Sequence, residues 1–242
     1  MPLPGTPVPS DGFASVPALQ AVFWDLDGTI VDTEPYWIAA EKDLVRTHGG
    51  TWTDEEAGEL VGQALSYSAR RLQQAGVDLP VESVIAALTE RVAERIRRRV
   101  PWRPGARELL EGLAAAGIPC ALVTMSTGPL ARLVAAQLPA GTFRFIVTGE
   151  TVRHGKPHPE PYQRAFDELA AGIPGLSKSR CVALEDSHPG YTSARAAGLP
   201  AVAVPHFIPL PPDPQRLEWA TLAGRSVQDL QEVAGARAGA GQ

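Results

Sequence analysis

Short apolar runs recur along the chain and are separated by longer amphipathic stretches. Almost every position in these runs is apolar, which is typical of strands buried on both faces of a sheet. From residue 120 onward helical patterns lie between the runs, and this alternation predicts right-handed crossovers and a parallel sheet. The predicted strands are residues 21–24, 120–123, 143–147, 181–184 and 201–204, and the helices between them are 128–137, 159–170 and 190–197.

Residues 35–100 break this rhythm. They contain helical periods at 38–47, 68–75 and 84–96 and no convincing strand, so we expect a helical domain inserted after the first strand. The strand rhythm resumes after PWRPG at 101–105, a rigid segment suited to a crossing between domains.

The whole pattern predicts an α/β fold with a Rossmann-like three-layer core, a parallel sheet and an inserted α-helical domain. The two ends are rich in Pro, Gly, Ser and other small residues, and they lack an apolar period, so we expect disordered tails. The expected boundaries are 1–18 for the N-terminal tail, 19–34 and 101–233 for the core, 35–100 for the insert and 234–242 for the C-terminal tail.

Composition narrows the class of protein. The chain has 242 residues, 44% hydrophobic and 20% charged, which excludes small disulfide scaffolds and a mostly disordered chain. Its net charge of -5 gives no general attraction to nucleic acid or to an anionic membrane. No apolar window is long enough to span a membrane, and the first residues lack the features of a signal peptide. We therefore expect a cytoplasmic protein with neither nucleic acid nor membrane as partner. A monomer is the default expectation, because the inserted domain must be able to move.

Polar residues follow the predicted strands. In an open parallel sheet, ligands bind outside the carboxyl ends of the strands, so these residues should converge on one edge. Lys156 follows the third run after a short loop, and the chain has only two other lysines. The residues directly after the first, second and fourth runs are Asp25-Leu26-Asp27-Gly28-Thr29, Thr124-Met125-Ser126 and Glu185-Asp186-Ser187.

This set of side chains predicts phosphoryl transfer. Four neighbouring carboxylates repel one another unless a cation offsets them, and oxygen ligands without a Cys or His cluster favour Mg²⁺. Asp25 is available as a nucleophile, and Asp27, two residues on along an extended chain, faces the same centre as acid and base. Lys156 would neutralise phosphoryl oxygens, and the hydroxyls of Thr124 and Ser126 would orient them.

At these residues the chain resembles the haloacid dehalogenase superfamily, from residue 21 to about residue 227. Its four motifs appear in order: DLDGT at 25–29, the strand-end Thr124, the lysine of GKPHPEPY, and LEDS at 184–187. The resemblance implies an aspartyl-phosphate on Asp25 and acid-base work by Asp27. It also implies Mg²⁺ held by Asp25, the Asp27 carbonyl and Asp186, with Glu185 ligating the metal or one of its waters.

The position of the insert resembles the branch with β-phosphoglucomutase, phosphoglycolate phosphatase and sugar-phosphate phosphatases. There the insert is a cap that opens to admit substrate and closes to exclude water. The dehalogenases carry an aromatic residue where Asp27 stands, so the resemblance implies a phosphatase for a small phosphorylated metabolite, above all a sugar phosphate. The residues expected to bind phosphate or substrate are Gly28, Thr29, Thr124, Met125, Ser126 and Lys156, with Glu34 and Gln63 on the cap side.

Two alternatives stay open at this stage. A phosphomutase would return the phosphoryl group to a sugar, but the stretches GQALSYS and TEPYW lack the Arg and His that β-phosphoglucomutases carry there. A non-catalytic binding protein would not need to keep every catalytic position. We interpret His154, His158 and His188 as ordinary loop histidines, because none has the spacing of metal ligands.

Overall fold

The computed structural model describes residues 19–61 and 65–238, and it confirms the predicted parallel sheet. Strand β1 lies near the centre, where Val22 pairs with Cys120 on one side and with Val182 on the other. Every pairing is parallel, in the order β3-β2-β1-β4-β5-β6. The strands are β1 (Ala21–Trp24), β2 (Cys120–Val123), β3 (Phe143–Val147), β4 (Cys181–Glu185), β5 (Ala201–Ala203) and β6 (Leu217–Glu218).

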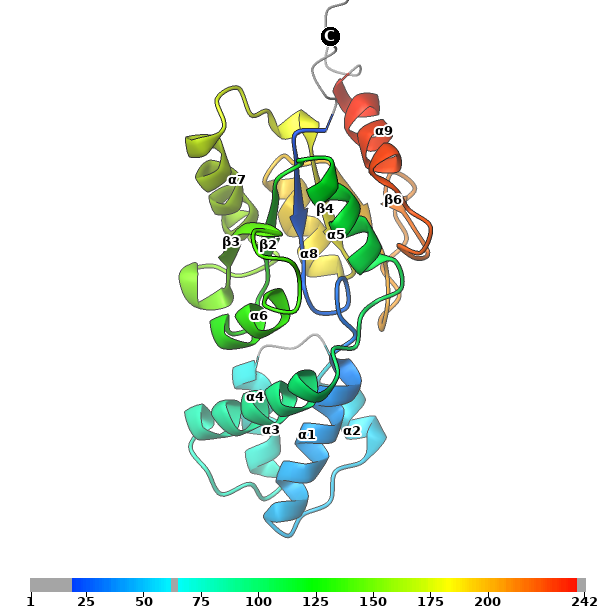
Figure 1. Ribbon diagram of the computed structural model, residues 1–242. Helices are drawn as coiled ribbons and strands as arrows, with labels where there is room; N and C mark the ends of the chain where they lie inside the picture. The colour runs from blue at the N-terminus through cyan, green and yellow to red at the C-terminus, as the bar shows by residue number, and fades with distance from the viewer. Residues whose placement is uncertain (1–18, 62–64, 239–242) are drawn as a thin grey trace, which may run out of the picture.

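Helices cover both faces of the sheet and complete three layers (Figure 1). Side chains of a strand point alternately to the two faces, so Val22 and Trp24 join one apolar cluster while Ala21 and Phe23 join the other. The first cluster packs against α5 (Ala106–Ala115), α6 (Gly128–Ala135) and α9 (Val227–Ala238). The second packs against α7 (Glu160–Gly172) and α8 (His188–Ala196), and short turns η1 (Gly149–Thr151) and η2 (Lys178–Arg180) precede α7 and β4.

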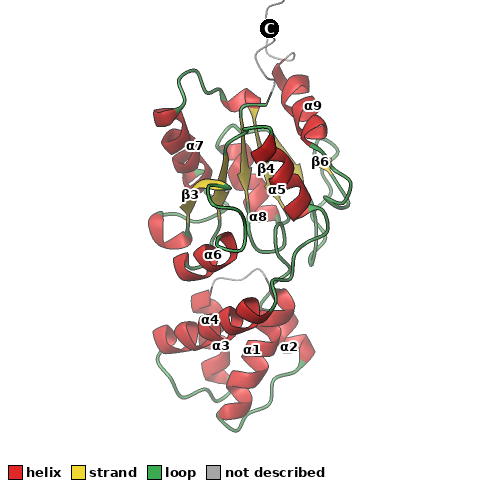
Figure 2. Ribbon diagram, in the orientation of Figure 1, coloured by secondary structure: helices red, strands yellow, loops and turns green. Residues whose placement is uncertain are grey.

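The regular elements of the insert, within its described residues 35–61 and 65–100, are all helices. Its longest helix buries Val84, Leu88, Val92 and Ile96, which recur every four residues on one face. A capping box between Thr53 and Glu56 begins the short second helix. Figure 2 shows these helices beyond the edge toward which the strands run. They are α1 (Glu34–Thr47), α2 (Asp54–Gly58), α3 (Leu65–Gln74) and α4 (Val81–Arg98).

The two crossings between core and insert lie side by side. Val31 and Trp102 form an antiparallel bridge. The amide of Asp32 donates to the carbonyl of Pro101 over 2.8 Å, and the amide of Arg103 donates to the carbonyl of Ile30 over 2.8 Å. The chain therefore leaves and re-enters the core at one joint.

Two features differ from the sequence expectation. The predicted start of the C-terminal tail at residue 234 is wrong, because α9 continues to Ala238 and buries Leu230 and Ala234, four residues apart on one face. The edge strand β6 was not predicted, since both of its residues are exposed and form no apolar run. The predicted tails at 1–18 and 239–242 lie outside the described residues. Among the described residues, no helix is long and apolar enough to cross a membrane.

Candidate active site

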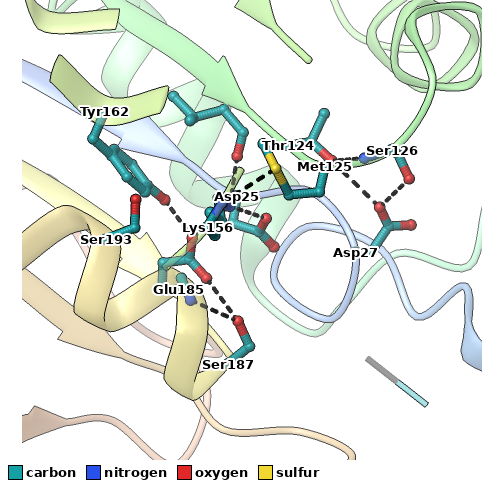
Figure 3. Close-up of polar contacts among 12 residues, drawn as sticks. Asp25, Asp27, Thr124, Met125, Ser126, Lys156, Tyr162, Glu185, Ser187 and Ser193 are labelled. Carbon is teal, nitrogen blue, oxygen red and sulfur yellow. Dashed lines mark hydrogen bonds and ion pairs between the residues drawn. The ribbon is translucent and has the colours of Figure 1, made fainter. Parts of the chain in front are cut away.

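The carboxyl edge of the sheet holds a buried cation between two carboxylates. Asp25 directly follows β1, and its amide donates to the carbonyl of Leu184 over 3.1 Å. The ammonium of Lys156 lies 2.6 Å from Asp25 Oδ1, 2.6 Å from Glu185 Oε1 and 2.8 Å from the carbonyl of Val123 (Figure 3). Segments far apart in the sequence thus meet at one charged centre, as the order of strands predicts.

Burial and neighbouring charges shift the pKa values of the ionisable groups at this centre, in opposite directions for Lys156. Burial lowers the pKa of Lys156, but Asp25 and Glu185 raise it by more, so the ammonium form is firmly held. Burial and the neighbouring Asp25 raise the pKa of Glu185 to about 7, although Lys156 lowers it. Burial, with Asp25 and Glu185, also raises the pKa of Asp186 well above its ordinary value. Three carboxylates beside one ammonium leave negative charge that a further cation would offset.

Those three carboxylates have the chemistry of a Mg²⁺ site. One oxygen each from Asp25, Glu185 and Asp186 lies within 4.8 Å of the others. Asp25 Oδ2 is buried and has no hydrogen-bond partner within residues 19–61 and 65–238, so it is free to be a ligand. Hard carboxylate oxygens without nitrogen or sulfur fit Mg²⁺. The Asp27 carbonyl stays a predicted fourth ligand.

Two glycines make room for these carboxylates. Gly28 has a φ of +83°, and a Cβ there would lie 2.0 Å from Asp186 Oδ2. In α8 a Cβ on Gly190 would lie 1.9 Å from Glu185 Oε2. Any side chain at either position would displace a carboxylate from the cluster. Gly28 was predicted as a site residue; the need for Gly190 was not.

Asp27 has a different environment from Asp25. The hydroxyl of Thr33 donates to Asp27 Oδ1 over 2.6 Å, the hydroxyl of Ser126 donates to Oδ2, and that of Thr124 donates to Oδ2 over 3.4 Å. Burial raises the pKa of Asp27, and this outweighs the hydrogen bonds from Ser126 and Thr33. A carboxyl whose pKa is raised by burial is suited to carry a proton to a leaving group.

The remaining residues predicted to bind phosphate or substrate differ in their surroundings. The thioether of Met125 accepts the amide of Lys156 over 3.4 Å, so this side chain holds the lysine loop. Thr29 is fully buried, and its hydroxyl has no partner within the described part of the chain. Glu34 begins α1, and burial together with Asp27 and Asp32 raises its pKa to about 7. Glu34 is therefore near enough to Asp27 for the two carboxylates to repel each other. Gln63, the other residue predicted on the cap side, lies outside the described residues.

Sequence reasoning missed two supporting side chains. The hydroxyl of Tyr162, a fully buried residue of α7, donates to Glu185 Oε1. Thr33 holds Asp27, as described above. Their signals in the sequence were weak: Tyr162 ends the GKPHPEPY segment, and Thr33 stands directly before the Glu34 that was predicted.

Comparison with known proteins agrees with this architecture. Residues 22–204 match the family described as haloacid dehalogenase-like hydrolase. Protein CbbY of Rhodobacter capsulatus is 31% identical, over 89% of this chain and 99% of its own. Hexitol phosphatase A of Escherichia coli K12 is 32% identical, over 87% of this chain and 93% of its own. A crystal structure of CbbY from Rhodobacter sphaeroides with xylulose-1,5-bisphosphate has a TM-score of 0.76 at 25% identity, covering 88% of this chain and 99% of that one. This chain therefore belongs to the haloacid dehalogenase-like hydrolases.

Proposed function

We propose that this protein is a Mg²⁺-dependent phosphatase that hydrolyses a small phosphorylated sugar or sugar alcohol through an aspartyl-phosphate on Asp25. One observation carries the proposal: Lys156 holds Asp25 and Glu185 together, each over 2.6 Å, at the carboxyl edge of the sheet. Nothing about folding requires a fully buried glutamate and two aspartates around one lysine, since such clusters are costly to bury.

In the first step, an oxygen of Asp25 attacks the phosphorus of the substrate in line with the ester oxygen. A bond forms between Asp25 and phosphorus, and the bond between phosphorus and the ester oxygen breaks. Asp27 gives its proton to the departing alkoxide, which leaves as an alcohol. The raised pKa of Asp27 supports this role, because it keeps the proton available.

In the second step, water attacks the phosphorus of the aspartyl-phosphate. Asp27, now a carboxylate, takes a proton from that water, and inorganic phosphate leaves while Asp25 is restored. Lys156 stays charged throughout, since its pKa is raised by Asp25 and Glu185. Mg²⁺ bound by Asp25, Glu185 and Asp186 would supply positive charge to the phosphoryl oxygens.

The substrate class rests on the insert and on the relatives. Glu34 lies in the first turn of α1 beside the core, where a carboxyl group can bind sugar hydroxyls. Two relatives are named a hexitol phosphatase and a phosphorylated carbohydrates phosphatase, 32% and 28% identical to this chain. Closure of the insert as a cap over the bound substrate would exclude bulk water from the site. A cytoplasmic monomer is part of this proposal.

The deciding experiment measures phosphate release from sugar phosphates, sugar-alcohol phosphates, phosphoglycolate and nucleoside monophosphates, with and without Mg²⁺. Asp25→Asn should abolish release, because an amide cannot attack phosphorus. Asp78→Asn is the matched control, since Asp78 is exposed in the insert, and it should keep full activity. Release that survives Asp25→Asn would refute the nucleophile.

A phosphomutase is the second candidate on the same fold, and one solved neighbour is described as a putative β-phosphoglucomutase, at 23% identity. The two candidates differ in the acceptor of the phosphoryl group. Incubation with a sugar 1-phosphate and a trace of the bisphosphate separates them: a phosphatase liberates inorganic phosphate, and a mutase yields the 6-phosphate.

A further inference from the structure

A second cluster of ligating side chains lies on the loop that carries Lys156, apart from the carboxylates described above. His154 and His158 flank that lysine, and Glu160 begins α7. One ligating atom of each lies within 4.8 Å of the other two. The sequence predicts that the two histidines are ordinary loop residues, but in the structure Glu160 joins them and completes a set of three ligating side chains.

The distances in this cluster suit a tetrahedral ion. Glu160 Oε2 lies 2.8 Å from His154 Nδ1 and 4.0 Å from His158 Nδ1. Ligands placed about 2.0 to 2.1 Å from a tetrahedral Zn²⁺ lie about 3.3 Å from one another. The observed separations fall on both sides of that value, so small side-chain rotations would bring all three to one ion.

The carboxylate is fixed and charged before any ion arrives. Glu160 Oε1 accepts the amide of Arg153 over 2.7 Å, and Oε2 accepts the amide of His154 over 3.0 Å. These bonds and the one from the His154 ring lower the pKa of Glu160 to about 2. A ligand held in place in this way loses little conformational entropy on binding.

The loop backbone is equally constrained. The hydroxyl of Ser193 donates to the carbonyl of His158 over 2.6 Å, and the amide of His158 donates to the carbonyl of Gly155 over 3.0 Å. The two rings lie with centroids 4.6 Å apart. Their side chains are 64% and 50% exposed, so an ion reaches them from solvent. Binding through both Nδ1 atoms would replace two hydrogen bonds, the 2.8 Å contact of the His154 ring with Glu160 Oε2 and the 3.2 Å bond from the Glu160 amide to His158. That amide lies at the open N-terminal end of α7, where water can accept from it.

We propose that His154, His158 and Glu160 form a second metal site, selective for borderline divalent ions such as Zn²⁺. Two imidazoles and one carboxylate are the ligand set of known zinc sites with an open water position, whereas Mg²⁺ prefers oxygen alone. The site is distinct in chemistry from the all-carboxylate cluster at Asp25. It does not depend on the proposed function.

Calorimetric titration of the untagged chain with Zn²⁺, in excess Mg²⁺ at about pH 7.5, tests this site. We expect one equivalent to bind in the micromolar range. Co²⁺ in its place should give the visible absorption of an ion with nitrogen ligands. The double variant His154→Ala/His158→Ala should weaken Zn²⁺ binding at least about tenfold. Far-ultraviolet circular dichroism and the melting temperature of each variant establish that it folds.

Two controls locate the ion. His188, expected in a loop, is instead the first residue of α8 and is exposed, so His188→Ala removes another surface histidine and should leave the affinity unchanged. Asp186→Asn removes a carboxylate of the other cluster and should also leave Zn²⁺ binding intact. Wild-type affinity in the double variant, or loss of binding in Asp186→Asn alone, would overturn the proposal, as would absence of Zn²⁺ binding by the wild-type chain.

Discussion

The core and the insert each bury a glutamate, and the pKa of each carboxyl rises to about 7. In the core, Glu185 contacts the Lys156 ammonium and accepts from the Tyr162 hydroxyl. In the insert, Glu41 is 5% exposed and accepts from the indole of Trp52 over 3.3 Å, while Glu34 adds a like charge nearby. The two carboxyl groups thus reach the same pKa in different surroundings. Glu185 lies beside a cation that lowers its pKa, whereas the causes that shift the pKa of Glu41 include no cation.

Lys156→Met should have the largest effect, because it removes the cation from the core cluster. We expect a loss of activity on the order of a thousandfold. The free energy of unfolding should fall by about 3 to 5 kcal/mol, since buried carboxylates lose their partner. Initial rates and urea unfolding measure the two effects.

Lys42→Met is the matched change in the insert. Lys42 pairs with Asp54, and the two side chains are 35% and 89% exposed. An exposed ion pair of this kind contributes less than about 1 kcal/mol to the free energy of unfolding, so Lys42→Met should lower that free energy by no more than this amount. Equal losses of activity and of unfolding free energy in Lys156→Met and Lys42→Met would contradict the distinction between a functional lysine and a surface one.

Gly28→Ala should rank second and can be compared with Gly49→Ala. Both glycines have positive φ, +83° and +78°, so each alanine costs about 1 to 2 kcal/mol in stability. Only the Gly28 methyl meets Asp186, at 2.0 Å, whereas nothing lies within 4 Å of the Gly49 position. Displacing that carboxylate should lower activity about a hundredfold. Equal activities would refute a role for the close approach at Gly28.

Glu41→Gln tests whether the buried Glu41, whose pKa shift has no cation among its causes, makes the stability of the protein depend on pH. Burial, then Glu34, raises the pKa of Glu41 from 4.5 to about 7, so the folded state holds a proton that the unfolded state has released between these values. The free energy of unfolding therefore falls as pH rises through this window, by up to about 3 kcal/mol. Glutamine removes this loss. The melting temperature of Glu41→Gln should exceed that of wild type at pH 8, and the difference should vanish at pH 4.

Tyr162→Phe should have the smallest effect of the set. It removes one hydrogen bond to Glu185 and no charge, so we expect the Mg²⁺ concentration for half-maximal activity to rise about tenfold. Tyr36→Phe removes a comparable bond in the insert, from the phenol to the carbonyl of Arg99 over 3.0 Å. It should leave the Mg²⁺ requirement unchanged. The reverse ranking would show that Tyr162 only fills space.

The sequence predicted β1, β2, β4 and β5 because these strands are buried along their whole length and are almost entirely apolar, as at 181–184. It did not foretell β6, which is exposed and two residues long. At the site, Asp25, Asp27 and Lys156 stand at strand ends or in motifs, where order along the chain predicts proximity. The contact of Tyr162 with Glu185 depends instead on how α7 packs against the sheet, and no local pattern encodes that packing.

The antiparallel bridge between Val31 and Trp102 has a consequence for engineering. Neighbouring strands lie about 4.7 to 4.9 Å apart, a gap that a two-residue turn spans. A short turn could therefore join the two crossings, but the insert and the core share one apolar cluster and α4 contacts α6, so removing the insert would expose apolar core side chains to water. Because both crossings meet at one place, exchanging the insert would change a single segment of the chain and leave the order of the strands as it is.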